Sequence, residues 1–344
     1  MNLKPSHDLT NVSEGVLGIC IPTYRRPELL RRCVISAFNA AGKYSINIYI
    51  SDDSGDDTNL NVISELSNIY GENITHHKNE INLGIDNNIQ FVTTLCRCDY
   101  IWLVGEDDFF LEGSVENVLR QLLNKDHDFI LLNYAYIGNK SDETLGLALP
   151  DKLDKLLSID DFLCKYMWAT GFIGACVIRR ELWLNTDPVR YKGTYYSHVG
   201  RIAEIVLSGG VTNIISKPHV ANRVEGGVDN FTWKSDSYGV YFGYLSMCDR
   251  VALKFPNYSS LIEVGKQTMT NRYRWLSYRL VLRLRAQQGF DFYQFKKYII
   301  TARVSFVKKC LFGIISITPA LILRPLLWLR TFRKKYAHIA IQKY

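Results

Sequence analysis

The sequence lacks the features that mark three classes of protein. Residues 1–15 are polar, without the apolar segment of a secretory signal peptide. The 8 cysteines are irregularly spaced and match neither a secreted disulfide framework nor a zinc motif, which predicts reduced thiols in a cytosolic protein. The uncharged apolar run at residues 310–323 is shorter than the roughly 20 residues that a transmembrane helix needs.

Acidic residues are almost absent from the C-terminal part. Residues 272–344 contain 16 Lys and Arg and one acid, Asp291, whereas the rest of the chain contains 25 Lys and Arg and 33 Asp and Glu. The two parts therefore carry +15 and −8, which sum to the net charge of +7. An acidic body with a basic tail indicates an anionic partner for the tail, either nucleic acid or an anionic membrane surface.

The chain does contain short apolar strands that alternate with amphipathic helices. Strands are predicted at residues 16–21, 46–50, 75–78, 100–106 and 129–132, and helices at 28–40, 60–69, 86–96 and 114–123. Asp57 or Thr58 is expected to cap the second helix. This alternation predicts an α/β fold in which a mainly parallel sheet has helices on both faces.

Acidic side chains follow two of these strands. Asp52 and Asp53 end the second strand, and Glu106, Asp107 and Asp108 end the fourth. Parallel strands with right-handed crossovers would bring both groups to one edge of the sheet. Since unpaired carboxylates are costly to bury, an acid-x-acid pair there suits Mg²⁺ or Mn²⁺ held together with a substrate phosphate. Taken alone, each group is equally consistent with a solvated turn.

Four segments, in order, resemble the family 2 glycosyltransferases with the GT-A fold. They are residues 19–27 (ICIPTYRRP), residues 52–58 (DDSGDDT), the Asn-Leu-Gly turn (Asn82, Leu83 and Gly84), and Glu106-Asp107-Asp108 in the place of the DXD motif. Glu106 departs from the first Asp of that motif. The resemblance implies a Rossmann-like GT-A fold, a nucleoside-diphosphate sugar as donor, and Mn²⁺ or Mg²⁺ as cofactor.

The resemblance also assigns donor-binding residues, which are Pro22, Thr23, Tyr24, Arg26, Asp52, Asp53, Asn82, Gly84 and Asp107. It implies that Pro22, Thr23 and Tyr24 line the nucleoside pocket and that Asp53, with Asp52, accepts hydrogen bonds from the base or ribose. Asp107 would lie near the donor sugar or ribose. Glu106 and Asp108 would hold the metal against the diphosphate, whose developing charge a cation stabilises.

An inverting transfer needs a general base that takes the proton of the acceptor hydroxyl. The resembling family usually places an Asp at the start of the helix after an acceptor-facing strand, here predicted at residues 170–178. By spacing, His198 has that position, and imidazole is a competent base near neutral pH. Glu204 is the second candidate. The alternatives are that His198 caps or packs the helix and that Glu204 is a solvated helix residue.

Residues 221–233 are predicted to form a mobile loop in which Gly226 and Gly227 permit a hinge. Arg223 would reach the diphosphate and Trp233 would stack on a sugar. An ordinary surface loop with a packed Trp is the alternative.

The basic tail begins with a predicted helix at residues 273–285, and its apolar stretch is interrupted by Arg324 and Pro325. We expect this stretch to lie in or dip into the inner leaflet, with its cationic flanks on anionic lipid. The alternative is a buried C-terminal helix that packs on the body.

The sequence therefore predicts a catalytic domain at residues 1–240, with a nucleotide-sugar-binding half at 1–135 and an acceptor half at 136–240. Residues 241–344 would form a helical, basic, membrane-associating region. The predicted enzyme is a metal-dependent, inverting hexosyl- or deoxyhexosyltransferase, peripheral on the cytoplasmic face of a bacterial membrane. It would act on a lipid-linked glycan in O-antigen or capsule synthesis, without a nucleic-acid partner. A metal-dependent nucleotidyltransferase and a non-catalytic RNA-binding protein that uses the basic tail are the alternatives.

Overall fold

The computed structural model describes residues 15–124, 126–138, 144–150, 154–223, 236–302 and 304–324. The chain forms two compact units, the first from Met1–Val224 and Met247–Gly265, the second from Glu225–Ser246 and Lys266–Tyr344. Helices α8 (Ser237–Lys254) and α9 (Ser259–Tyr273) contribute to both units. The predicted domain boundary at residue 240 stays a prediction.

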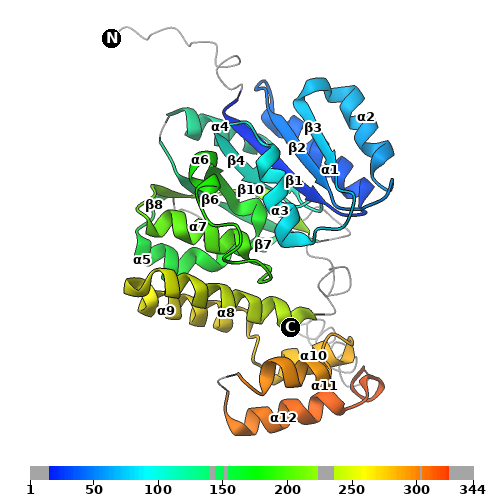
Figure 1. Ribbon diagram of the computed structural model, residues 1–344, viewed down its shortest axis with the longest axis vertical. Coiled ribbons are helices and arrows are strands. Elements are labelled where there is room, and N and C mark those ends of the chain that lie inside the picture. Colours follow the sequence, from blue (N-terminus) through cyan, green and yellow to red (C-terminus); the bar gives the residue numbers. More distant parts are fainter. Residues whose placement is uncertain are drawn as a thin grey trace, which may run out of the picture. The chain divides into compact units, whose positions relative to one another are not determined.

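The first unit is built on one ten-stranded sheet (Figure 1). Its strands are β1 (Leu17–Thr23), β2 (Asn47–Asp52), β3 (Ile74–Lys78), β4 (Tyr100–Leu103), β5 (Phe109–Phe110), β6 (Phe129–Ile137), β7 (Thr144–Leu147), β8 (Lys155–Leu156), β9 (Cys176–Arg179) and β10 (Thr212–Arg223). Their order is β3-β2-β1-β4-β9-β6-β10-β5, with β7 beside β6 and β8 beside β10. The first four strands in this order pair in parallel, and β9 then runs antiparallel to both of its neighbours.

Helices cover the sheet on both faces (Figure 1). Those of the first unit are α1 (Pro27–Ala41), α2 (Leu60–Tyr70), α3 (Ile85–Leu95), α4 (Ser114–Asn124), α5 (Ile159–Asp161), α6 (Arg180–Leu184) and α7 (Ser197–Leu207). Helix α1 contacts α2 and α4, whereas α3 contacts β1, β2 and α7. The predicted α/β class is therefore confirmed.

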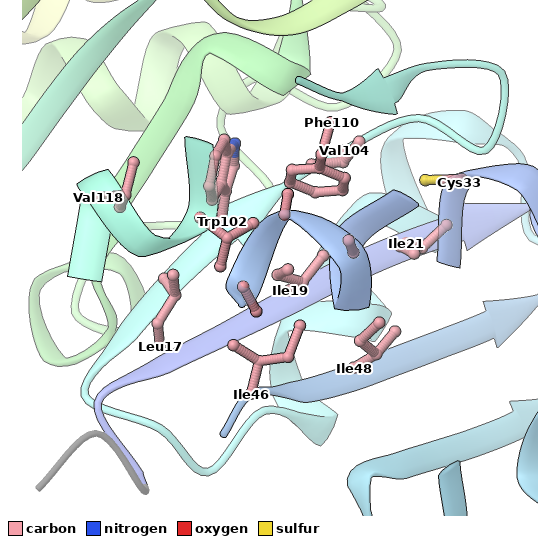
Figure 2. Packing of buried hydrophobic residues seen from close by; sticks show 14 of the residues in the cluster. Leu17, Ile19, Ile21, Cys33, Ile46, Ile48, Trp102, Val104, Phe110 and Val118 are labelled. Carbon is pink, nitrogen blue, oxygen red and sulfur yellow. The ribbon is translucent and has the colours of Figure 1, made fainter. Parts of the chain in front are cut away.

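A dry core lies directly below the carboxyl ends of β1 and β4 (Figure 2). Ile19 and Ile21 of β1 are completely buried and belong to the same cluster as Trp102 and Phe110. The Trp102 and Phe110 rings meet edge to face at 4.8 Å, and Trp102 Nε1 donates to the carbonyl of Gly174 at 2.9 Å. This packing fixes the strand ends from which the candidate site extends.

Two predicted elements differ in the structure. The strand expected at residues 170–178 is confined to Cys176–Arg179, because 3-10 turns occupy Met167–Gly171 and Ile173–Ala175. The helix expected at 273–285 is interrupted: α9 ends at Tyr273 and Arg274 has a left-handed φ of 50°. Helix α10 then starts after Ser277, whose side chain accepts a hydrogen bond from Leu280 N as an N-cap.

The second unit contains the helices α10 (Tyr278–Ala286), α11 (Phe292–Gln294) and α12 (Phe306–Ile317), together with parts of α8 and α9. Its core is aromatic, with Tyr238, Tyr241, Phe290 and Phe312 buried. Among the described residues, we find no helix with the length and apolar character needed to span a bilayer.

Candidate active site

Two acidic turns flank the carboxyl end of β1. Thr23 of β1 is aligned with Asp52 of β2, and Cys20 of β1 with Leu103 of β4. Both pairings are parallel, so the segments that leave β2 and β4 emerge at the edge where β1 ends. This confirms that the two acidic segments share one edge of the sheet. We call residues 52–58 the first acidic turn and residues 105–108 the second acidic turn.

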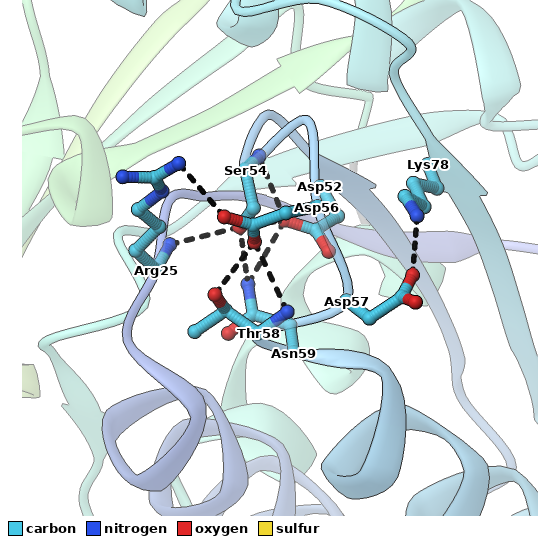
Figure 3. Close-up of polar contacts among 8 residues, drawn as sticks. All are labelled: Arg25, Asp52, Ser54, Asp56, Asp57, Thr58, Asn59 and Lys78. Atoms are coloured by element: carbon cyan, nitrogen blue, oxygen red, sulfur yellow. Dashed lines mark hydrogen bonds and ion pairs between the residues drawn. The ribbon is translucent and has the colours of Figure 1, made fainter.

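The carboxylate of Asp52 organises the first acidic turn (Figure 3). Its Oδ1 accepts hydrogen bonds from Ser54 N at 3.1 Å, from Ser54 Oγ at 2.5 Å and from Asn59 Nδ2 at 2.9 Å. Asp52 is completely buried. Because an ionised carboxylate needs such donors when it is buried, Asp52 shapes the turn. Its predicted contact with the donor stays a prediction.

Helix α2 is not capped as expected. It begins after Asn59 with no side-chain cap. Asp57 instead pairs with Lys78, and Thr58 Oγ1 donates to Asp56 Oδ1 at 2.6 Å (Figure 3). The prediction that Asp57 or Thr58 caps the helix is wrong, because Asp57 binds Lys78 of β3 and Thr58 binds Asp56 within the turn.

Asp53 holds the Asn-Leu-Gly turn. Its Oδ1 accepts from Leu83 N at 2.7 Å and from Asn79 Nδ2 at 3.1 Å, and its Oδ2 accepts from Gly84 N at 3.0 Å. Asn82 Oδ1 accepts from the same Gly84 N–H at 2.9 Å. Gly84 has a φ of 79°, which glycine adopts without strain. The structure thus brings Asp53, Asn82 and Gly84, which were predicted to bind the nucleotide sugar, into one hydrogen-bonded unit.

Two adjacent arginines after β1 reach different acidic turns. The guanidinium of Arg25 lies 2.7 Å from the Asp56 carboxylate of the first turn. That of Arg26 lies 3.3 Å from Glu106 and 3.1 Å from Asp107 of the second turn. Arg25 has a left-handed φ of 53°, which is uncommon for a residue other than glycine. The loop after β1 therefore connects both acidic turns through ion pairs.

The residues predicted to line the nucleoside pocket lie at this same strand end. Pro22 and Thr23 close β1, and Tyr24 follows with 36% of its surface exposed. Thr23 is buried, and its Oγ1 has no hydrogen-bond partner among the described residues. A buried hydroxyl without a partner is unfavourable, so Thr23 offers a polar atom for which a ligand would supply the partner.

The second acidic turn contains a buried carboxylate, Asp108, that has no cationic partner in the part of the chain that the structure describes. Asp108 is 6% exposed, and the described residues form no ion pair with it. Burial raises the pKa of Asp108 well above its usual value, and the charges of Asp107 and Glu106 raise it further. The pKa of Glu106 is also raised, first by burial and then by Asp107, whereas Arg26 opposes the shift. Ionisation of these carboxyls is therefore unfavourable unless a cation lies beside them.

Two carboxylate oxygens of this turn lie close to Gly105. A side-chain carbon at Gly105 would lie 3.0 Å from Asp107 Oδ1 and 3.1 Å from Asp108 Oδ2, so both oxygens lie close to one point. Carboxylate oxygens are the ligands that Mg²⁺ and Mn²⁺ prefer. Burial raises the pKa of the Cys33 thiol, which contacts the Gly105 carbonyl at 3.6 Å. Across the described ranges, no three His, Cys, Asp or Glu side chains form a metal-binding group.

His198 is buried at the start of α7. Its Nε2 lies 3.0 Å from the Thr170 carbonyl oxygen, and its Nδ1 has no hydrogen-bond partner among the residues that the structure describes. Because a carbonyl only accepts, this contact assigns the proton to Nε2 and the free lone pair to Nδ1. Burial lowers the pKa of His198 to about 4, so the ring is neutral at pH 7. Its role as a base stays a prediction.

Glu204 is buried within a network of charged groups. Its Oε1 accepts from Tyr191 Oη at 2.8 Å and pairs with Arg190 Nε at 3.2 Å, and its Oε2 accepts from Lys254 Nζ at 2.7 Å. Glu204 is 3% exposed, so the alternative of a solvated helix residue is wrong. Both of its oxygens already bind partners, which favours a structural role over that of a base.

Asp86 was missed by the sequence reasoning. It lies in the first turn of α3, and its Oδ2 accepts from Gly193 N at 2.8 Å and from Tyr195 N at 3.3 Å. Its Oδ1 lies 3.5 Å from Ser197 N, the first residue of α7. An acid in a first helical turn is so common that the sequence gives no signal of this contact. It ties the Asn-Leu-Gly turn to the helix that carries His198.

The mobile loop was predicted at residues 221–233, but residues 221–223 belong to β10, so the loop prediction is wrong for these three residues. Arg223 is the last residue of that strand and is aligned with Ile137 of β6. The rest of the predicted loop, including Trp233, lies outside the described residues. Their contacts with a donor stay predictions.

The sequence is similar to known glycosyltransferases. The family model described as glycosyl transferase family 2 matches residues 18–184, a range that includes both acidic turns. The abequosyltransferase RfbV of Salmonella typhimurium is 26% identical over 246 residues, which represent 67% of this chain and 73% of that protein.

The fold is similar to solved glycosyltransferase structures. TarS of S. aureus superposes with a TM-score of 0.57 at 10% identity, over 88% of this chain and 90% of that chain. The mannosyltransferase PcManGT from Pyrobaculum calidifontis, solved with GDP-Man and Mn²⁺, has a TM-score of 0.51 at 10% identity, over 87% and 78%. Identities this low establish the fold alone, and that fold is GT-A. The predicted fold is thereby confirmed.

Proposed function

Because the chain belongs to glycosyl transferase family 2 through residues 18–184, we propose that it transfers a sugar from a nucleoside-diphosphate sugar to a glycan in bacterial O-antigen or capsule synthesis. The acceptor is a lipid-linked glycan, the anomeric configuration is inverted, and the enzyme works at the cytoplasmic face of the membrane. The similarity to an abequosyltransferase favours a deoxyhexosyl donor over a hexosyl donor.

One observation carries the proposal, namely the buried Asp108 carboxylate, which no cationic side chain among the described residues neutralises. The other buried carboxylates of the described residues each bind three donor groups of the protein, as Asp53 and Glu204 do. Asp108 and Glu106 would hold Mn²⁺ or Mg²⁺, with Asp107 close by. These residues would thereby place a positive charge that stabilises the negative charge of the leaving nucleoside diphosphate.

The first acidic turn would bind the nucleoside. The Asp53 carboxylate has about four lone-pair sites, of which three accept N–H groups of the protein. The remaining site, on Oδ2, would accept a hydrogen bond from the base or ribose. Thr23 Oγ1, which is buried without a partner among the described residues, would lie beside it. The Arg26 guanidinium, which pairs with Asp107, would also interact with the negatively charged diphosphate.

His198 would act as the general base through Nδ1. The acceptor oxygen forms its bond to the anomeric carbon while the bond from that carbon to the diphosphate oxygen breaks. The hydroxyl proton passes to Nδ1, and the electron pair leaves with the nucleoside diphosphate. Burial keeps the ring neutral and therefore able to accept this proton at pH 7. Residues 136–240 would form the acceptor half.

The test is a release assay with purified protein, a panel of nucleoside-diphosphate sugars and Mn²⁺, with and without a chelator. We expect release of nucleoside diphosphate that stops on chelation. Asp108→Asn should lower the rate by at least roughly 100-fold, since it removes a charge from the stabilising site. The matched control is Asp99→Asn, an exposed acid outside both turns, which should keep its rate.

The other classes predict different results. Release of pyrophosphate would identify a nucleotidyltransferase. Tight, salt-dependent RNA binding without turnover of any donor would identify a non-catalytic RNA-binding protein. Full activity of Asp108→Asn in the presence of chelator would contradict the metal-dependent mechanism.

A further inference from the structure

Helix α12 exposes large apolar side chains along one side. Their exposed fractions are 79% for Phe306, 75% for Val307, 42% for Leu311, 60% for Ile314 and 63% for Ile317. At 100° per residue these positions fall within an arc of about 140° on the helix. We call these five residues the α12 outer face.

The opposite side of α12 is apolar as well, and it is already packed. Phe312 and Ile315 are buried and belong to the core of the second unit, and Ser316 is buried beside them. A helix with apolar side chains on two opposite sides normally has both sides covered. Continuous exposed apolar patches usually mark a surface that binds a protein or a membrane. The α12 outer face therefore requires an occupant.

The charges around this face indicate which occupant it has. Lys308 and Lys309 lie on the two sides of the arc, each about 60° beyond its margin. The described residues of the second unit contain eleven Lys and Arg but two acids, Asp236 and Asp291. An apolar strip between cationic margins is the pattern of helices that lie in the surface of an anionic membrane. A protein partner would need a strongly acidic rim to match it.

The length of α12 determines how it would bind. Its 12 residues extend about 18 Å, whereas the hydrocarbon core of a bilayer is about 30 Å thick. We propose that the α12 outer face enters the boundary between headgroups and acyl chains of an anionic phospholipid bilayer, with the helix axis in the membrane plane. This inference specifies the surface through which the proposed enzyme would meet a lipid-linked acceptor, and in that respect it rests on the proposed function.

The test is sedimentation of the full chain with vesicles of phosphatidylcholine alone or mixed with phosphatidylglycerol. We expect binding to the anionic vesicles at least roughly tenfold tighter than to the neutral ones. Ile314→Asn combined with Ile317→Asn should weaken binding at least roughly tenfold without changing charge. Lys308→Gln should weaken it only on anionic vesicles. The matched control is Ile69→Asn on α2, because Ile69 is 59% exposed and Ile314 is 60% exposed; it should bind as the wild type does.

Several results would overturn the inference. One is unchanged vesicle binding by the Ile314→Asn, Ile317→Asn protein when its unfolding transition matches the wild type. Another is a dimer of the wild type in sedimentation equilibrium that becomes monomeric in this variant, since the occupant would then be a second copy of the chain. Turnover of the sugar donor without vesicles tests the proposed function separately. If turnover is absent while vesicle binding by the wild type and the variants is as expected, the proposed function is wrong and the proposed membrane binding by α12 is retained.

Discussion

The Glu204→Gln substitution separates a structural role of this residue from a catalytic one. The wild-type carboxylate is 3% exposed and binds Tyr191, Arg190 and Lys254. The amide keeps the shape of the side chain and can still accept from the Tyr191 hydroxyl. It loses the charge, however, and it presents an NH₂ group to a cation.

The magnitude follows from the exposure of the partners. The side chains of Arg190 and Lys254 are 38% and 35% exposed, so solvent screens both ion pairs and each contributes less than about 1 kcal/mol. Tyr191 is completely buried, and weakening a buried charge-assisted bond costs about 1 kcal/mol. We therefore expect Glu204→Gln to lower the free energy of unfolding by about 2 kcal/mol and to leave the turnover per folded molecule within about threefold.

Urea unfolding followed by tryptophan fluorescence measures the first quantity, and donor turnover under native conditions measures the second. Glu116→Gln is the control, because Glu116 forms an ion pair with Arg120 one helical turn away that solvent screens, so the unfolding free energy should hardly change. If Glu204→Gln retained its unfolding free energy but lost activity by 100-fold or more, Glu204 would be the base and our assignment of His198 would be wrong.

Three further predictions concern the acidic turns and the buried histidines. Asp108→Asn should abolish metal-dependent transfer. It should also raise the melting temperature of the metal-free protein, because a neutral amide replaces a carboxylate whose charge is costly to bury. A lower melting temperature would show that the carboxylate has a stabilising partner. Asp53→Ala should lower the free energy of unfolding in urea by about 3 kcal/mol, since three N–H donors lose a charged acceptor. Asp56→Ala, at an exposed ion pair that solvent screens, should lower it far less. Burial lowers the pKa of both His198 and His219 to about 4, so the unfolded chain binds more protons below pH 6.5 and each histidine should remove about 2 kcal/mol of stability between pH 7 and pH 5. His219→Asn should flatten this dependence by about half of the two-histidine effect, and a variant whose stability falls as steeply as the wild type would contradict the assignment.

The order of the elements was determined by the sequence alone. Period-two and period-3.6 apolar patterns placed the first four strands and their helices, because burial on a sheet or helix face needs those spacings wherever the fold puts them. Parallel strands joined by right-handed crossovers end at the same edge, which predicted that Asp53 and Asp108 lie at one edge of the sheet. The basic character of the C-terminal region is likewise a property of composition.

The state of each acid was decided only by the tertiary structure. Asp52, Asp53 and Glu204 are acids like Asp108, yet each of the first three binds three donor groups of the protein. Among the described residues, Asp108 has a backbone hydrogen bond from Gly105 and no cationic partner. The donors come from residues distant in the chain, such as Leu83 for Asp53 and Lys254 for Glu204. Hydrogen bonds depend on ångström-scale distances and on angles that no local pattern records, and burial depends on what packs above a side chain. For this reason the sequence could indicate where the carboxylates gather, whereas the folded chain alone determines which of them remains available to a cation.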